Sequence, residues 1–282
     1  MPKTKNQLPV VNDPREELVA QGNDLIRHAR FQLTALEQNI IYFCISKIKP
    51  TDKDFMRLSF TVTEFCDACG IKADAGNQGG HIYRRIKAAV KSVSDKSAWT
   101  EYSDGSEELV RWFDTFKLQK NTGEMSVVLS QSMKPYLIGL IERARAGGEG
   151  YTQTYLLIYL ALQSKYSKRL YEILKSYLYS SVNPKTETIE KIYRPQLLEY
   201  ELDELQQLLN AEKYGRYQDL RRKVLEVAER EINAVTDITM SYSPVKTGRK
   251  ITGICFNFQH KQPMDRVSAT LSAKGILDGH VW

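Results

Sequence analysis

The sequence predicts an α+β protein in which one small domain occurs twice in tandem. Two observations lead to this prediction: helical and strand-like patterns follow the same order in both halves, and the helices of the halves match at a nearly constant separation. The chain has 282 residues, 42% of them hydrophobic, so each half is long enough to bury a core. Charged residues make up 26%, with a formal net charge of +6.

The first half begins with a helix, because apolar residues recur at helical spacing from about Thr34. A strand-like run at 55–62 follows. Thr61 and Glu64 then form a capping-box pattern that opens a second helix. A loop rich in glycine and asparagine separates it from a third helix at 82–95.

Strand-like runs end each half. In the first half, the runs at 97–103 and 109–118 flank a DGSEE turn, which predicts a hairpin. The second half starts after the GGEG segment at 147–150 with new helical patterns. It ends in the runs DITMSYS and KITGICFNF, which are joined by the basic segment PVKTGR.

The helices of the two halves align residue by residue. Matched pairs are Leu36 with Leu170, Ile40 with Leu174, Phe65 with Leu205, Tyr83 with Tyr217 and Val90 with Val224. Agreement in element order favours duplication over chance periodicity. Each half therefore has a helix, a short strand, a helix, a turn, a helix and a hairpin. This is the order of a winged-helix domain, in which a hairpin wing follows a helix-turn-helix.

The predicted domain limits follow from these patterns. We expect a flexible N-terminal arm at 1–18, an N-terminal winged-helix domain at 19–148, a C-terminal winged-helix domain at 149–260 and a flexible tail at 261–282.

Positive charge is concentrated at the start of the helix at 217–233. Residues 213–223 hold five basic side chains against Asp219 alone, whereas acidic residues dominate 224–237. A helix N-terminus prefers acidic groups, so this reversed arrangement predicts an external anion such as the DNA backbone. Arginine can pair with guanine and glutamine with adenine. The candidate DNA contacts are Lys213, Arg216, Tyr217, Gln218, Asp219, Arg221, Arg222 and Lys223.

An alternative interpretation of this helix is a solvated surface held by ion pairs such as Arg222 with Glu226.

The second wing adds candidate contacts to the DNA backbone, namely Lys246, Arg249 and Lys250. The first-half helix offers Tyr83, Arg84, Arg85, Lys87 and Lys91, which suit phosphate contact better than base recognition. The turn SDGSEE, interpreted as the first wing, is acidic and is expected to stay away from phosphate. The C-terminal domain is therefore expected to make the stronger DNA contacts.

Several functional classes find no support in the sequence. There is no GxxxxGK[ST] motif, the four histidines are scattered, and no catalytic triad is visible, so we expect no enzyme and no cofactor. Cys66 and Cys69 form a CxxC without further ligands nearby, which favours core packing over a metal site. No apolar run is long enough for a membrane span and no secretion signal is visible, which predicts a cytoplasmic protein.

Four segments carry a resemblance to a known family: NDLIRHARFQLTALEQNIIYFCISKI (23–48), FTVTEFCDACGI, YRRIKAAVKSV and LQSKYSKRLYEILKSY (162–177). Together and in this order they resemble the iteron-binding replication initiators of theta-replicating plasmids, the Rep protein family. The resemblance implies a protein that binds direct repeats in a plasmid origin as a monomer, helps to open the origin and recruits the host initiator and replicative helicase. It also implies a dimer that represses its own gene, with the second winged helix as the main reader of bases.

Two alternatives stay open at this point. A dedicated transcriptional repressor without initiator activity would share every DNA-binding feature. A scaffold that uses winged helices only for protein contacts would show no salt-dependent DNA binding. The apolar strands at 109–129 are a candidate dimer surface, and the segment at 262–282 matches no family element.

Overall fold

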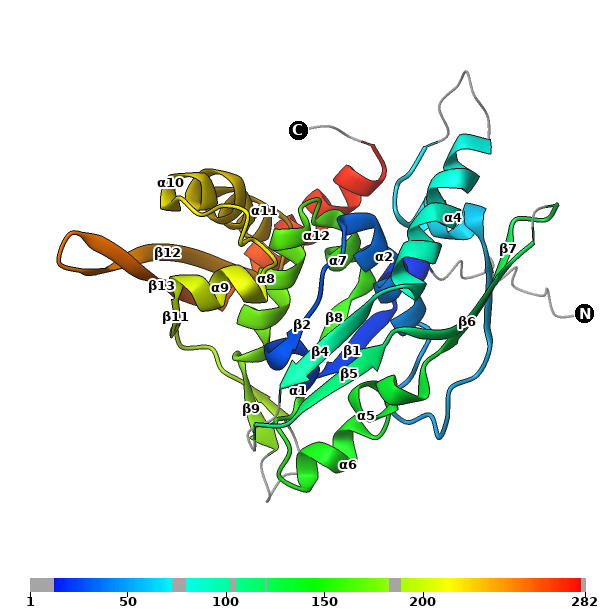
Figure 1. The fold of residues 1–282 in the computed structure, drawn as a ribbon, viewed down its shortest axis with the longest axis horizontal. Coiled ribbons are helices and arrows are strands. Elements are labelled where there is room, and N and C mark those ends of the chain that lie inside the picture. The colour runs from blue at the N-terminus through cyan, green and yellow to red at the C-terminus, as the bar shows by residue number, and fades with distance from the viewer. Residues whose placement is uncertain (1–12, 73–79, 102–104, 120, 183–188, 280–282) are drawn as a thin grey trace, which may run out of the picture.

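Two small antiparallel sheets share one topology in the computed structural model, which describes residues 13–72, 80–101, 105–119, 121–182 and 189–279. The first has the order β3-β7-β6 and the second the order β11-β13-β12 (Figure 1). The first unit contains α2 (Ala35–Ile45), β3 (Leu58–Thr61), α3 (Val62–Ala68), α4 (Gly80–Ser94), β6 (Phe113–Leu118) and β7 (Glu124–Leu129). The second contains α8 (Lys165–Ser176), β11 (Gln196–Glu201), α9 (Leu202–Leu208), α10 (Tyr217–Leu220), η3 (Arg221–Leu225), α11 (Glu226–Val235), β12 (Ile238–Thr247) and β13 (Lys250–His260). The predicted pair of winged-helix units is confirmed.

Capping explains where the helices of the first unit begin. The Thr61 side chain accepts a hydrogen bond from the amide of Glu64, and the Glu64 carboxylate accepts one from the Thr61 amide, so the predicted capping box is present. Thr34 and Glu37 form a second box at the start of α2. These caps satisfy amides that a helix N-terminus otherwise leaves without partners.

The duplication extends further than the sequence matches indicated. Before α2 lie β1 (Leu18–Gly22) and α1 (Asn23–His28), and before α8 lie β8 (Tyr151–Tyr155) and α7 (Leu156–Ala161). β1 pairs with β8 antiparallel, with Leu18 opposite Tyr155 and Gly22 opposite Tyr151. The first residue of each strand thus faces the last residue of the other. The register of the strand pair therefore has local two-fold symmetry about Ala20 and Gln153. Figure 1 shows β1 and β8 side by side near the middle of the molecule.

Helix α8 lies at the centre of the molecule, and every residue from Tyr166 to Ser176 is buried. Its charged side chains have partners on both sides. Arg169 donates to the Ala29 carbonyl at 2.6 Å, and Glu172 accepts from Gln21 at 2.8 Å, both in the first half of the chain. A buried charge is tolerated only where such partners replace water. The segment 162–177 that carries the family resemblance therefore joins the two repeats.

Lys175 extends these contacts to the second unit, where its ammonium lies 2.9 Å from Asp237, just after α11. Burial alone would raise the pKa of Asp237, but the neighbouring Lys175 lowers it. Lys168 donates to the Tyr159 carbonyl, and burial lowers its pKa to about 7.

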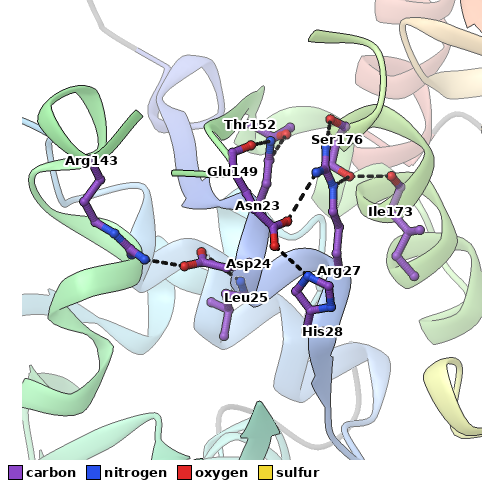
Figure 2. Close-up of polar contacts among 10 residues, drawn as sticks. All are labelled: Asn23, Asp24, Leu25, Arg27, His28, Arg143, Glu149, Thr152, Ile173 and Ser176. Carbon is purple, nitrogen blue, oxygen red and sulfur yellow. Dashed lines mark hydrogen bonds and ion pairs between the residues drawn. The ribbon is translucent and has the colours of Figure 1, made fainter. Parts of the chain in front are cut away.

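A second polar network ties α1 to the region of the predicted domain boundary. Figure 2 shows that Arg27 and His28 both reach Glu149, at 3.2 and 2.8 Å. Arg27 also donates to the Ser176 carbonyl at the end of α8. The hydrogen bond with Glu149 raises the pKa of His28. The boundary between the two domains at 148/149 stays a prediction. These contacts join α1, before the boundary, to Glu149 and α8, after it.

The run at 109–118 is not one strand, and the first wing was placed wrongly. It divides into β5 (Glu107–Arg111) and β6 at Trp112, because Trp112 and Phe113 are both buried and break the alternation of a strand. β5 pairs with β4 (Ser97–Glu101) in a separate sheet, which also contains β2 (Ala29–Arg30) and has the order β2-β4-β5. The acidic segment SDGSEE (103–108), part of which lies outside the described residues, leads from β4 into β5 in the sequence. The wing is the hairpin β6-β7.

The predicted flexible segments are also corrected where the structure describes them. Residues 1–12 lie outside the described ranges, but Pro14–Glu16 form a short 3₁₀ helix, η1, capped by Asp13. At the other end, Pro263–Leu277 form the helix α12, which packs against α7 and α11. Ala269, Ala273 and Leu277 are buried along one side of it. Their spacing of four residues is helical, a pattern not used in the expectation of a flexible tail.

The remaining elements are β2 (Ala29–Arg30), η2 (Gln131–Met133), α5 (Lys134–Leu137), α6 (Leu140–Arg145), β9 (Tyr179–Val182) and β10 (Ile189–Lys191). Among the residues that the structure describes, no helix combines the length and the apolar character needed to cross a membrane.

Candidate nucleic-acid interface

The turn of the second helix-turn-helix is fixed by backbone and amide hydrogen bonds. Asn210 ends α9 in the left-handed region, with φ of 49°, a conformation that asparagine tolerates better than most residues. The Ala211 amide donates to the Gln206 carbonyl at 2.7 Å, and the Gln206 side chain donates to the Tyr214 carbonyl at 2.7 Å. These bonds set the direction in which the next helix leaves the turn.

That next helix, which we call the recognition helix, is continuous from Tyr217 to Val235 through α10, η3 and α11. The segment η3 is a π-helical turn in which the Glu226 amide donates to the Arg221 carbonyl. Such turns are rare and occur often at functional sites. One consequence is that the adjacent residues Val224 and Leu225 are both buried, whereas Val227 is half-buried.

The π turn also changes the expected ion pairs. Arg221 pairs with Glu226 at 2.9 Å, and Arg222 pairs with Asp219 at 3.5 Å, instead of the expected pair between Arg222 and Glu226. The side chains of Arg221 and Arg222 are 55% and 68% exposed. Exposed pairs of this kind contribute about 0–1 kcal/mol, so both guanidinium groups can change partners at low cost.

The recognition helix begins without a side-chain cap, and basic residues lie at its N-cap and in the π turn. Arg216 occupies the N-cap position and makes no capping hydrogen bond. Lys213, Arg216, Gln218 and Lys223 are exposed, as predicted for DNA contacts. An open pocket at this end is lined by Gln218, Asp219, Arg221, Arg222 and Glu226.

Tyr217 is half-buried, and burial raises the pKa of its phenol. It packs partly against the hydrophobic core, so only part of its side chain remains for a ligand. Its role in DNA binding stays a prediction, as do those of the other candidate residues.

The second wing projects from the body beside the start of the recognition helix, at the left of Figure 1. Thr247 pairs with Lys250, which leaves Gly248 and Arg249 at the tip, and Gly248 has a φ of 63°. The side chains of Lys246, Arg249 and Lys250 are exposed. In the same wing, burial raises the pKa of Tyr242 to about 12, with Tyr217 and Glu226 adding to the effect. The recognition helix and the wing thus present their basic groups at one end of the molecule.

The first unit presents a simpler basic surface on α4. Ile86, Val90 and Val93 are buried, which leaves Arg84, Arg85, Lys87 and Lys91 exposed and Tyr83 half-buried. Figure 1 places α4 and α10 toward opposite ends of the long axis. This placement suits two separate contact regions, one on each unit, better than one continuous contact region.

Lys117 is an exposed basic residue on β6 that sequence reasoning missed. It was overlooked because the wing was assigned to the hairpin around the acidic turn. The pairing of Leu58 with Val127 shows that β7 lies next to β3, the place of a wing strand. The argument that the first wing avoids phosphate therefore loses its basis.

The CxxC pair lies in and beside α3. Cys66 is buried and Cys69 is half-buried, both as free thiols. Burial raises the pKa of Cys66 to about 11 and that of Cys69 to about 12, so both are protonated at neutral pH. Core packing of Cys66 is confirmed. Within the described ranges, no group of three or more histidine, cysteine or acidic side chains is arranged to hold a metal ion.

This arrangement defines a tandem winged-helix protein whose second recognition helix has its basic residues gathered around its start. The model of the family domain described as Initiator Replication protein, WH1, matches residues 18–175, and that of Initiator Rep protein, WH2, matches 201–258. The chain therefore belongs to the initiator Rep protein family of plasmids, and the predicted resemblance is confirmed.

Three individual proteins are similar to this chain to different degrees. A replication initiation protein of Escherichia coli is 23% identical over 262 residues, covering 90% of this chain and 73% of that protein. The crystal structure of the Pi initiator protein in complex with iteron DNA has a TM-score of 0.66 at 18% identity, covering 88% of this chain and 99% of that one. A WH1 domain of a replication protein isolated from a multiple sclerosis patient covers 36% of this chain and 77% of that chain, at 16% identity and a TM-score of 0.26.

Proposed function

We propose that this protein initiates plasmid replication by binding direct repeats in the plasmid origin, with the second winged helix as the main reader of bases. The observation that carries the proposal is the uncapped basic start of the recognition helix beside a basic wing. Gln218, Arg221 and Arg222 would contact base edges, and Lys246, Arg249 and Lys250 the backbone. The Pi initiator, which shares the fold, was crystallised on iteron DNA.

The first winged helix would contribute weaker contacts through α4. Arg84, Arg85, Lys87 and Lys91 would contact phosphate, and phosphate contacts position a protein on the duplex without reading its sequence. Lys117 on the first wing would add to these contacts. The proposal assigns no catalytic step and no cofactor to the chain. Its target DNA would place it in the cytoplasm.

Initiation requires more than binding. Opening of an adjacent segment of the origin, recruitment of the host initiator and replicative helicase, and repression of the protein's own gene are parts of the proposal that follow from family membership. For repression as a dimer, the β4-β5 hairpin offers an apolar surface. Trp99 and Leu109 lie opposite each other there and are 50% and 46% exposed. Paired exposed apolar side chains on a sheet favour association with a second copy.

A footprint on the plasmid DNA that flanks the gene tests the proposal. Protection of several direct repeats, weakened steeply by salt, is expected. Protection of a single inverted repeat at the promoter would instead show a dedicated repressor. Absence of any salt-dependent protection would show that the winged helices serve protein contacts.

A further inference from the structure

The C-terminal helix α12 connects the two helix-turn-helix elements, although it lies outside both matched family domains, which end at residues 175 and 258. We propose that α12 is a strap that fixes the separation of the two DNA-binding helices, and thereby the spacing within a DNA site that the protein accepts. The inference rests on the proposed function, since it requires that both winged helices touch one duplex.

The strap starts at a fixed point on the recognition helix. The buried Lys261 donates through its ammonium to the carbonyls of Asn233 and Thr236, at 2.6 and 2.8 Å. Its amide donates to the Asp237 carbonyl at 2.9 Å. Carbonyls at a helix C-terminus carry partial negative charge and lack partners in their own helix, so a buried lysine is well placed there. The chain therefore leaves β13 already attached to the end of α11.

The body of the strap then crosses toward the first unit. Ala269, Ala273 and Leu277 form its buried side, and it packs against α11 and α7. Two of these residues are alanine, which allows close approach of the helices. A helix of 15 residues spans about 22 Å at the usual rise, enough to bridge two small units. Figure 1 shows α12 between α11 and α2.

The far end of the strap contacts the first helix-turn-helix directly. Gly70 follows α3 with a φ of 64°, and a Cβ atom at this position would lie within 2.9 Å of the Cα atom of Leu277. The backbones of the two segments are therefore in contact, and glycine is required both by its conformation and by this approach. Lys72 adds a hydrogen bond to the Asp278 carbonyl at 3.2 Å.

Ion pairs join the same end of the strap to the segment before β1. Arg15 lies 2.7 Å from Asp278, and Lys274 lies 3.0 Å from Glu16. The β1-β8 pairing and α8 hold the inner parts of the two repeats together. The strap instead ties the end of α11 to the end of α3. The first of these helices is the last part of the recognition helix, and the second precedes α4. Loosening it should change the separation of those helices without altering their surfaces.

The test compares strap variants with a matched control on the same helix. Leu277→Ala removes a side chain that is 3% exposed. The double variant Lys274→Ala, Asp278→Ala removes the two ion pairs through side chains that are 37% and 46% exposed, and leaves the buried side of the helix intact. Leu271→Ala is the control, because Leu271 is 65% exposed. Each protein is titrated with its footprinted repeat and with repeats that carry one base pair inserted or deleted between the two contacted parts. Thermal melts establish that the variants fold, and the double variant carries the test if Leu277→Ala does not.

For the wild type and Leu271→Ala, the altered spacing is expected to weaken binding roughly tenfold, the cost of one displaced set of contacts. For the strap variants this penalty should fall to roughly threefold or less. An equal penalty in all proteins, or none in the wild type, would overturn the strap. A wild type that binds the repeat no better than unrelated DNA would instead refute the proposed function.

Discussion

Replacing Arg222 by alanine is expected to weaken binding to the origin repeat by roughly 5- to 150-fold while leaving the fold intact. The side chain is 68% exposed, and its ion pair with Asp219 is long, at 3.5 Å. Loss of such a surface pair changes stability by about 0–1 kcal/mol. Loss of a base contact costs about 1–3 kcal/mol, and each 1.4 kcal/mol is about tenfold in affinity. The small change in stability and the larger change in DNA affinity can therefore be measured separately.

Fluorescence anisotropy on the repeat and on its single base substitutions measures this effect. Arg230→Ala is the matched control, because Arg230 is exposed on the same helix but lies beyond the π turn. Arg222→Ala should also become indifferent to substitution at one base pair. Equal affinities for Arg222→Ala and Arg230→Ala, with unchanged base preference, would refute the assignment of Arg222 as a reader of bases.

Three further predictions concern the wing, the core and self-association. Lys246→Ala and Arg249→Ala should weaken binding to all sequences and each reduce the slope of log affinity against log salt by about one, and a loss confined to the repeat would contradict backbone contact. Burial lowers the pKa of Lys168 to about 7, against about 10.4 in the unfolded chain, so the unfolded state holds the extra proton between these values. The wild type should therefore gain stability relative to Lys168→Met as pH rises from about 7 to about 10 in urea denaturation, and a constant difference would argue against this pKa. Trp99→Ser should shift sedimentation toward monomer, and an unchanged balance of monomer and dimer would rule out β4-β5 as the dimer surface.

Local patterns predicted much of the fold because their causes are local. The capping box of Thr61 and Glu64 depends on residues three apart, and the apolar side of α4 depends on helical spacing. Both are present in the structure. The order of elements was sufficient to predict two winged-helix units, since duplication supplies the same information twice.

Pairing between distant strands could not be predicted in the same way. The hairpin around the acidic turn and the hairpin β6-β7 both look like wings in sequence, and only the position of β7 beside β3 distinguishes them. The packing of α12 against the first unit likewise depends on a contact between distant residues. Leu277 lies against Gly70, and no local sequence pattern connects the two. The π turn at 221–225 has no sequence pattern that we recognised, although it determines the ion pairs of both central arginines.

The exposed basic groups of the candidate interface were predictable because charge is visible in sequence. The distribution of five basic residues over 213–223 identified the start of the recognition helix. The structure exposes all five side chains, and the N-cap residue, Arg216, makes no side-chain capping hydrogen bond. Lys117 was missed because its role depends on which hairpin is the wing.

The most direct test of the central claim is a nuclease footprint of the purified protein on the plasmid DNA around its own gene, at increasing salt. We expect protection of several short direct repeats, lost first in Arg222→Ala and preserved in Arg230→Ala. Protection limited to one inverted repeat, or protection that neither salt nor the Arg222 substitution changes, would contradict an initiator that reads direct repeats through its second winged helix.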